Sequence, residues 1–224
     1  AWTVSFVGLF YLTVAFTVIA MALTIACAYP LTRPELKGRK FFTTVVVITM
    51  YFSGGILPLY VLIKTLGMLN TMWSLILPLA VSPFNLIILR TSLMTVPDSI
   101  TESALIDGAS YFRILTRIIL PLSLPIVATL SLFYAVGRWN LFQDALFYIS
   151  DAKRYTLQLK LALIVINNTS PEVFLLEGAD AGYRIVPAAM TAATVIIATV
   201  PILAAYPWLQ RYFISGVMLG SVKG

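Results

Sequence analysis

The chain has 224 residues, of which 60% are hydrophobic and 11% are charged, and its mean hydropathy is +0.94. Because soluble domains carry about 25% charged residues, this composition excludes a water-soluble fold. With no histidine and only Cys27, the chain cannot build a disulfide or a Cys-based metal site, and the missing histidine weighs against hydrolytic catalysis. It also lacks a GxxxxGKS/T phosphate loop, so any use of nucleotide must rest on another polypeptide.

Apolar segments long enough to cross a bilayer, about 20 residues each, recur along the whole chain. They predict an all-α, polytopic transmembrane bundle that forms one domain over residues 1–224. The five expected spans cover residues 3–29, 41–63, 72–90, 122–143 and 184–208. Proline and glycine interrupt several of them, which is typical of helices that line a cavity and equally of ordinary kinked helices. Both interpretations stay open from the sequence.

The connector at residues 30–40 sets the expected orientation. It carries Arg33, Lys37, Arg39 and Lys40 against a single acid, Glu35. By the positive-inside rule this connector is cytoplasmic. Five spans then place the N-terminus outside, the 91–121 segment and the C-terminus inside, and the 144–183 segment outside. The net charge of +6 is explained mostly by this orientation, so it predicts no nucleic-acid partner.

The segment at 95–125 is too polar to lie in lipid and reads as two short helices. Ser99 and Glu102 have the spacing of a capping box, which predicts a helix that begins at Ser99. Gly108 then breaks the chain. A second helix is expected to carry Phe112, Leu115 and Ile119 on one face and Arg113 and Arg117 on another, before Pro121 opens the fourth span.

Each residue of this segment has a local explanation: Glu102 as a cap, Gly108 as a helix stop, and the arginines as orientation charges. Their spacing is more specific. Glu102-Ser103-Ala104, three residues, Gly108, nine residues and then Ile118-Ile119-Leu120-Pro121 resemble the EAA loop of binding-protein-dependent ABC importer permeases, E-A-A-x3-G-x9-I-x-L-P. Ser103 in place of the middle alanine is the one departure.

The resemblance covers nearly the whole chain and is closest to MalG-type permeases of carbohydrate importers. The segments that carry it are Arg33-Pro34, Pro58-Leu59-Tyr60, Leu69-Asn70-Thr71, Leu89-Arg90, Trp139-Asn140 and Gln210-Arg211-Tyr212-Phe213. Within that group, the 133–140 segment and the ending at 216–224 are similar to permeases for oligo- or polysaccharides, including alginate importers.

The resemblance implies a type I ABC importer permease that moves a carbohydrate such as alginate by alternating access in a bacterial inner membrane. It implies a non-catalytic chain without a cofactor of its own. The expected partners are a homologous permease, two ATP-binding subunits that hold ATP and Mg, an extracytoplasmic solute-binding protein, the solute and membrane lipid. The family's first span is absent here, so we expect that a preceding segment is missing.

The resemblance also assigns a coupling role to the EAA loop, at about residues 95–121. Its short helix would sit in a cleft on an ATPase subunit and pass on the movement of the ATPase pair. The residues assigned to this contact are Glu102, Ser103, Ala104, Asp107 and Gly108.

A second candidate site lies near the outer end of the fourth span, where polar and aromatic residues cluster: Arg138, Trp139, Asn140 and Gln143, with Asp144 beside them. An indole beside hydrogen-bonding groups suits a sugar ring, and a guanidinium suits a carboxylate. The alternative is that Trp139 belongs to an interfacial belt and that Arg138 snorkels outward. The outer segment at 144–183 is expected either to dock the binding protein or to form a surface hairpin.

Three other functions are compatible with parts of the sequence. A permease of the same fold for another solute class would be revealed by its binding protein. An ion-coupled secondary transporter needs intramembrane carboxylates, and none of the nine acids lies well inside an expected span. An intramembrane enzyme needs a catalytic constellation that the chain does not offer, and no metal site is expected.

Overall fold

The computed structural model describes residues 2–169, together with residues 189, 192–193, 195–196, 199–200 and 203, which are helical. All regular structure in this part of the chain is helical. Apart from those few positions, the fifth expected span at 184–208 lies outside the described residues. So does the part of the expected outer segment that follows residue 169.

The longest helix, α1 (Trp2–Ala28), forms the spine of the bundle. Its 27 residues correspond to about 40 Å at 1.5 Å per residue, more than the hydrocarbon core of a bilayer. A stripe of buried side chains at helical spacing, which packs against α5 and α9, comprises Leu9, Leu12, Phe16 and Ala20. The opposite face is also apolar but exposed, as in a helix that meets lipid. The helix ends before η1 (Pro30–Thr32), where proline begins a single 3₁₀ turn.

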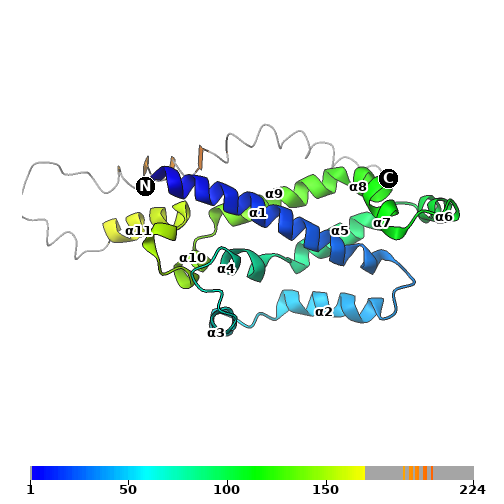
Figure 1. The fold of residues 1–224 in the computed structure, drawn as a ribbon, viewed down its shortest axis with the longest axis horizontal. Helices are drawn as coiled ribbons and strands as arrows, with labels where there is room; N and C mark the ends of the chain where they lie inside the picture. The colour runs from blue at the N-terminus through cyan, green and yellow to red at the C-terminus, as the bar shows by residue number, and fades with distance from the viewer. Residues whose placement is uncertain are drawn as a thin grey trace, which may run out of the picture.

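The second expected span is a pair of helices, α2 (Arg39–Tyr51) and α3 (Ile56–Thr65), whose axes differ by 114°. The bend lies at Gly55, whose φ of 82° and ψ of 177° suit glycine alone. No residue of α2 is buried, and Figure 1 shows α2 beside the main bundle with α3 turned across it.

The third expected span is also interrupted. A short first limb consists of α4 (Trp73–Ile76) and η2 (Leu77–Leu79), and a second limb is α5 (Pro83–Leu93), with 52° between them. Pro83 suits the first turn of α5 because it needs no amide donor there. Ser82 caps this helix, its hydroxyl accepting the Asn85 N–H at 3.3 Å.

A run of short helices leads into the fourth span. They are α6 (Asp98–Ile106), α7 (Tyr111–Ile114), the π-helical segment η3 (Leu115–Ile119) and α8 (Leu120–Leu122). The span itself is α9 (Leu124–Asn140), which meets the preceding run at 84°. The bend lies between Leu122 and Leu124, so Pro121 falls inside the preceding run and does not open the span.

Beyond α9 the chain forms α10 (Gln143–Tyr148), a 3₁₀ turn η4 (Ala152–Arg154) and α11 (Leu157–Thr169). The bundle therefore has two ends. Figure 1 places α3, α4, α10 and α11 toward one end and α6, α7 and α8 at the other. We call these the α10 end and the α6 end.

By length and apolar composition, one helical stretch within the described residues, Val7–Thr32, can cross a membrane unbroken. Three bent pairs qualify if each pair counts as one span, which gives up to four. These overlap the first four expected spans. The count of five and the missing preceding span remain predictions.

Candidate functional site: a projecting elbow and a buried clasp

The α6 helix projects from its end of the bundle (Figure 1). Thr101 is its one buried residue, while Glu102, Ser103 and Asp107 are exposed and Ala104 is half-buried. Two large apolar side chains stand out beside these polar groups: Ile106 is 86% exposed and Phe112 of α7 is 75% exposed. The elbow therefore presents a mixed apolar and acidic surface, which is typical of a surface that meets another protein.

Gly108 makes the turn of this elbow. Its N–H donates to the Leu105 carbonyl at 3.0 Å, and the next N–H, of Ala109, donates to the Ala104 carbonyl at 2.9 Å. These two bonds form a Schellman motif, which needs a left-handed residue just past the helix end, and Gly108 has φ of 78°. The predicted helix stop at Gly108 is confirmed, and with it the angle between α6 and α7 is defined by hydrogen bonds.

Two local predictions on this segment are wrong. The helix begins at Asp98 after Pro97, with no side-chain cap, so Ser99 lies inside the first turn and forms no capping box. Phe112 does not share the buried face of Leu115 and Ile119. Ile114 is buried with Leu115 and Ile119 instead, because the π-helical turn at Leu115–Ile119 shifts the spacing along the helix from i+4 to i+5. The cap of α7 is Ser110, whose hydroxyl accepts the Arg113 N–H at 3.4 Å.

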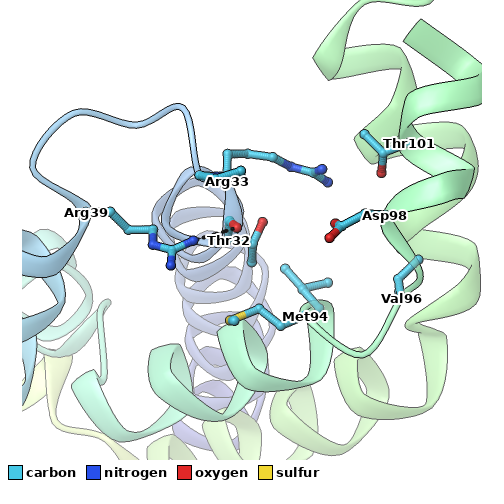
Figure 2. A pocket seen from close by; sticks show the side chains of 9 residues that line it. Thr32, Arg33, Arg39, Met94, Val96, Asp98 and Thr101 are labelled. Carbon is cyan, nitrogen blue, oxygen red and sulfur yellow. Dashed lines mark hydrogen bonds between the residues drawn. The ribbon is translucent and has the colours of Figure 1, made fainter.

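The connector at 30–40 lies at the same end as α6. A pocket of about 170 Å³ between them is lined by Thr32, Arg33, Arg39, Asp98 and Thr101, among others (Figure 2). The Arg33 guanidinium lies over the Tyr29 ring at 4.7 Å, and Arg39 donates to the Thr32 carbonyl at 3.3 Å. The basic connector and the elbow thus share one end of the bundle, as the orientation from sequence requires.

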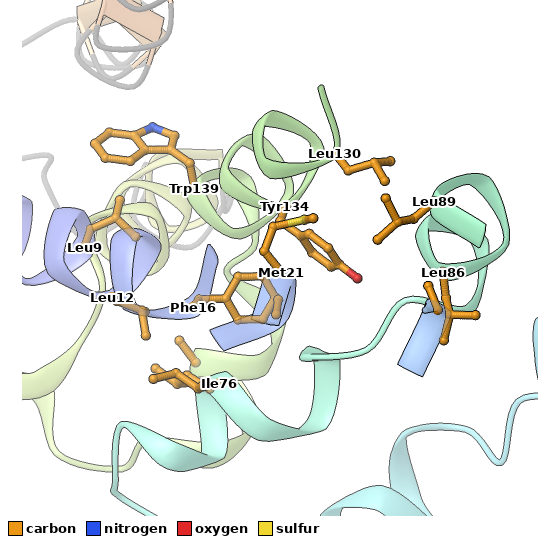
Figure 3. Close-up of a cluster of buried hydrophobic side chains, with 14 of the residues drawn as sticks. Leu9, Leu12, Phe16, Met21, Ile76, Leu86, Leu89, Leu130, Tyr134 and Trp139 are labelled. Carbon is orange, nitrogen blue, oxygen red and sulfur yellow. The ribbon is translucent and has the colours of Figure 1, made fainter. Parts of the chain in front are cut away.

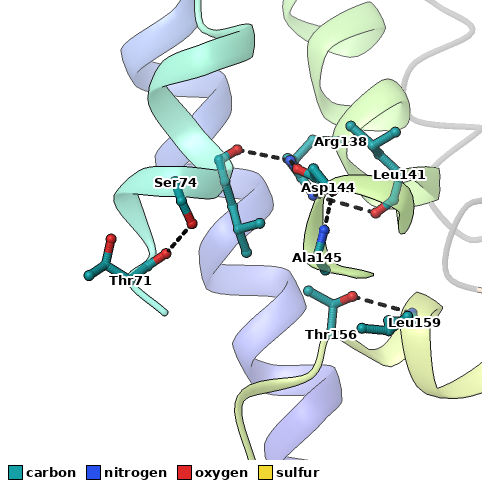
Figure 4. A network of polar contacts seen from close by, with 9 residues as sticks. Thr71, Ser74, Arg138, Leu141, Asp144, Ala145, Thr156 and Leu159 are labelled. Atoms are coloured by element: carbon teal, nitrogen blue, oxygen red, sulfur yellow. Dashed lines mark hydrogen bonds and ion pairs between the residues drawn. The ribbon is translucent and has the colours of Figure 1, made fainter. Parts of the chain in front are cut away.

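A buried ion pair occupies the α10 end (Figure 4). The Arg138 side chain is 0% exposed and that of Asp144 is 9% exposed. One guanidinium nitrogen of Arg138 bonds both Asp144 and the Leu75 carbonyl, the latter at 2.8 Å. The other donates to Asp144 at 3.0 Å and to the Leu141 carbonyl at 3.4 Å. We call this ion pair the clasp, because it joins the end of α9 to α10 and α4.

The outer candidate residues lie in different surroundings. The Arg138 side chain is 0% exposed and so does not snorkel outward, and both of its terminal nitrogens are bonded, to Asp144 and to two carbonyls. Trp139 is 7% exposed and belongs to the hydrophobic core (Figure 3). Asn140 is exposed, and its side-chain amide donates to the Val136 carbonyl at 3.0 Å. The four residues therefore do not form one surface.

Gln143, however, lines a pocket of about 180 Å³ between α3, α4 and α10. Its other lining residues include Asp144, Phe147 and Tyr148, and none of the ten is basic. Burial, followed by the Asp144 carboxylate, raises the pKa of the Tyr148 hydroxyl above its ordinary value of 10.0, so this hydroxyl remains a donor at neutral pH. Phe147 and Tyr148 were missed from the sequence, although they lie four residues after Gln143 and Asp144 respectively, on the same helical faces.

Asn70 bonds to the backbone at the C-terminal end of α10. It has φ of 60°, its N–H donates to the Tyr148 carbonyl at 2.9 Å, and its side-chain oxygen accepts the Ser150 N–H at 2.6 Å. Metal ligands are not gathered at either end: the described residues contain no group of three or more His, Cys, Asp or Glu side chains that could hold an ion.

This helical fold matches that of a type I ABC importer permease, and the family profile below places the chain among such membrane-embedded, non-catalytic subunits. The sequence profile described as "Binding-protein-dependent transport system inner membrane component" matches residues 3–218, and the chain belongs to that family. The resemblance predicted from the sequence is thereby confirmed.

Individual relatives agree with this assignment. The chain is 43% identical to Protein LplC of Bacillus subtilis, over 96% of this chain and 72% of that protein. It is 42% identical to the polygalacturonan/rhamnogalacturonan transport system permease protein YtcP of Bacillus subtilis, over 96% and 74%. Among solved structures, it resembles a chain of a bacterial ABC transporter involved in the import of the acidic polysaccharide alginate. That match has a TM-score of 0.82 and 26% identity, and it covers 93% of this chain and 74% of the other.

Proposed function

We propose that this chain carries an oligosaccharide through a bacterial inner membrane by alternating access, while partner subunits bind and hydrolyse ATP. Family membership supports a complex with a second permease, ATP-binding subunits and a solute-binding protein. The observation that carries the mechanism is the α6 elbow: a rigid, hydrogen-bonded turn that presents exposed Ile106 and Phe112 beside Glu102 and Asp107. A rigid joint passes a displacement from one body to another better than a flexible loop.

In this proposal the α6 end is cytoplasmic and meets an ATP-binding subunit, and the α10 end faces outward. Two arguments support it. The basic connector and the elbow lie at one end, as the positive-inside rule asks of cytoplasmic segments. The elbow also exposes apolar area that a partner surface would cover.

We further propose that the pocket beside Gln143 contacts the solute. It combines an amide, a phenolic hydroxyl and the rings of Phe147 and Tyr148, which suit the hydroxyl groups and apolar faces of sugars. Since Arg138 is closed within the clasp, the pocket offers no cation to a carboxylate. Recognition of an acidic sugar would then fall to the binding protein and the second permease.

Replacing Gln143 with Ala is expected to raise the KM of uptake by about three- to tenfold, as for loss of one or two hydrogen bonds. The rise should be similar for neutral and acidic oligosaccharides, because the amide would contact hydroxyl groups common to both. Asn140→Ala is the matched control, since Asn140 is exposed and does not line the pocket. An unchanged KM in Gln143→Ala would remove the pocket from the solute path.

The solute class rests on the relatives: one is named as a polygalacturonan/rhamnogalacturonan permease, and the similar solved structure belongs to a transporter involved in the import of the acidic polysaccharide alginate. We therefore favour a fragment of an acidic polysaccharide. The test is ATP hydrolysis by the reconstituted complex with its binding protein, measured with galacturonate oligosaccharides, alginate oligosaccharides and neutral maltodextrins. Stimulation by either acidic set alone supports this class. Stimulation by maltodextrins alone would replace it with a neutral oligosaccharide, and silence with all three would point to another solute class.

A further inference from the structure

The interruption of the third span leaves a backbone group without a helical partner. Ser82 lies between η2 and α5 in an extended conformation, with φ of −88° and ψ of 118°. Its N–H donates to the hydroxyl oxygen of Tyr134 in α9, at 3.1 Å. A side chain from another helix therefore supplies the acceptor that the broken helix lacks.

The Tyr134 hydroxyl also meets the Thr24 hydroxyl of α1, at 2.7 Å. Thr24 has one hydroxyl proton, which it donates to the Ala20 carbonyl at 2.7 Å. Tyr134 must then donate its own proton to Thr24 while it accepts from Ser82. The result is a directed chain of hydrogen bonds that joins three elements: Ser82 N–H to Tyr134, Tyr134 to Thr24, and Thr24 to the Ala20 carbonyl.

Tyr134 and Thr24 are buried in the apolar centre of the bundle, and Ser82 is half-buried at its edge. Tyr134 is 5% exposed and Thr24 is 0% exposed, and the Phe16 ring meets the Tyr134 ring edge-on at 5.9 Å (Figure 3). An unpaired N–H costs free energy in a membrane-spanning bundle, because lipid tails offer no acceptor in place of the lost one. The bend frees the Ser82 N–H, and the Tyr134 hydroxyl stabilises the bend by accepting a hydrogen bond from it.

The bend connects the two candidate sites. The limb before it contributes Ser74, Pro78 and Leu79 to the pocket beside Gln143, and the Leu75 carbonyl to the clasp. The limb after it, α5, ends at Leu93, and only four residues separate it from α6, which begins at Asp98. A change in the angle at Ser82 must therefore move the pocket and the elbow relative to each other.

We infer that Tyr134 is a positioning residue that pins the bend of the interrupted span, and through it the relation between the outward pocket and the elbow. Its hydroxyl, held between Ser82 and Thr24, favours the bent arrangement over a straightened one. The structural part of this inference stands on the hydrogen bonds alone, whereas its consequence for transport rests on the proposed function.

The test measures the bend directly in the assembled complex. Spin labels are placed at exposed positions on the two limbs, Trp73→Cys in α4 and Thr91→Cys in α5, after Cys27→Ser and removal of the partners' cysteines. The labelled chain that keeps Tyr134 and Thr24 should give one narrow distance distribution. Tyr134→Phe should add a longer distance and raise the ratio of straightened to bent forms about fivefold or more, as for loss of one buried hydrogen bond.

Matched variants separate the hydroxyl from general damage. Tyr11→Phe removes the same hydroxyl from a residue that is 65% exposed and should leave the distances unchanged. Thr24→Val removes the hydroxyl that accepts from Tyr134 and should act like Tyr134→Phe. Thr24→Ser keeps that hydroxyl and should behave like the chain with natural Thr24. This pair keeps the inference testable if Tyr134→Phe does not assemble.

The second readout is coupling. Tyr134→Phe should increase ATP hydrolysis without solute relative to hydrolysis with solute, at an unchanged KM for ATP. Identical distance distributions in Tyr134→Phe, Thr24→Val and the natural chain would overturn the inference. Because the distances are measured without solute, that failure is distinct from a wrong solute class.

Discussion

Replacing Arg138 with Met is expected to destabilise the chain by about 3–5 kcal/mol, the cost of leaving one partner of a buried ion pair uncompensated. The Asp144 carboxylate would lose its cation at a position where its side chain is only 9% exposed. The Leu75 carbonyl would lose its donor as well. The expected result is a large drop in the amount of assembled complex after detergent extraction, and a lower melting temperature for what remains.

The double change Arg138→Met with Asp144→Leu tests whether charge is the cause. Removing both charges should recover much of the assembled complex, because no isolated ion is then buried. Arg154→Met is the surface control. Arg154 pairs with Asp151 at 3.5 Å, but the two side chains are 61% and 45% exposed, so we expect a loss below about 1 kcal/mol. Equal loss in Arg138→Met and Arg154→Met would contradict the clasp.

The order and approximate position of the spans could be predicted from the sequence, because apolar length and Pro or Gly interruptions are local properties. The bends could not. Gly55 and Pro83 indicate where a helix is broken, yet the angles of 114° and 52° depend on contacts with distant helices. The acceptor of the Ser82 N–H, for example, lies 52 residues away in Tyr134.

In the candidate sites too, features set by neighbouring residues could be predicted from the sequence, and features set by distant contacts could not. The spacing around Gly108 predicted an elbow because a left-handed glycine after a helix is a local signal. Ser99 had the right spacing for a cap, but Pro97 let the helix begin one residue earlier. For Arg138 the sequence left open a solute contact and an outward-snorkelling side chain, because it shows a charge in a membrane segment without showing the partner of that charge. Asp144, six residues on, became that partner only when the chain turned after Asn140.

Replacing Gly108 with Val is expected to reduce solute uptake per ATP hydrolysed by about tenfold or more while the complex still assembles. Valine in the left-handed region costs about 1–2 kcal/mol or more, so the Schellman bonds from Gly108 and Ala109 should break. The angle between α6 and α7 would then no longer be fixed. Uptake and ATP hydrolysis are measured on the same proteoliposomes, so that a coupling defect is separated from a loss of protein.

Two comparisons decide whether the cause is the elbow itself. Gly108→Asn should retain most coupling, because asparagine tolerates the left-handed region better than valine. Gly67 ends α3 in the same motif: its N–H donates to the Lys64 carbonyl, the Met68 N–H donates to the Ile63 carbonyl, and Gly67 has φ of 66°. Gly67→Val therefore imposes equal strain at the α10 end, away from the elbow. If Gly67→Val uncouples as strongly as Gly108→Val, the defect is general strain and the elbow has no special role. If only Gly108→Val uncouples, the turn between α6 and α7 passes movement between ATPase and permease.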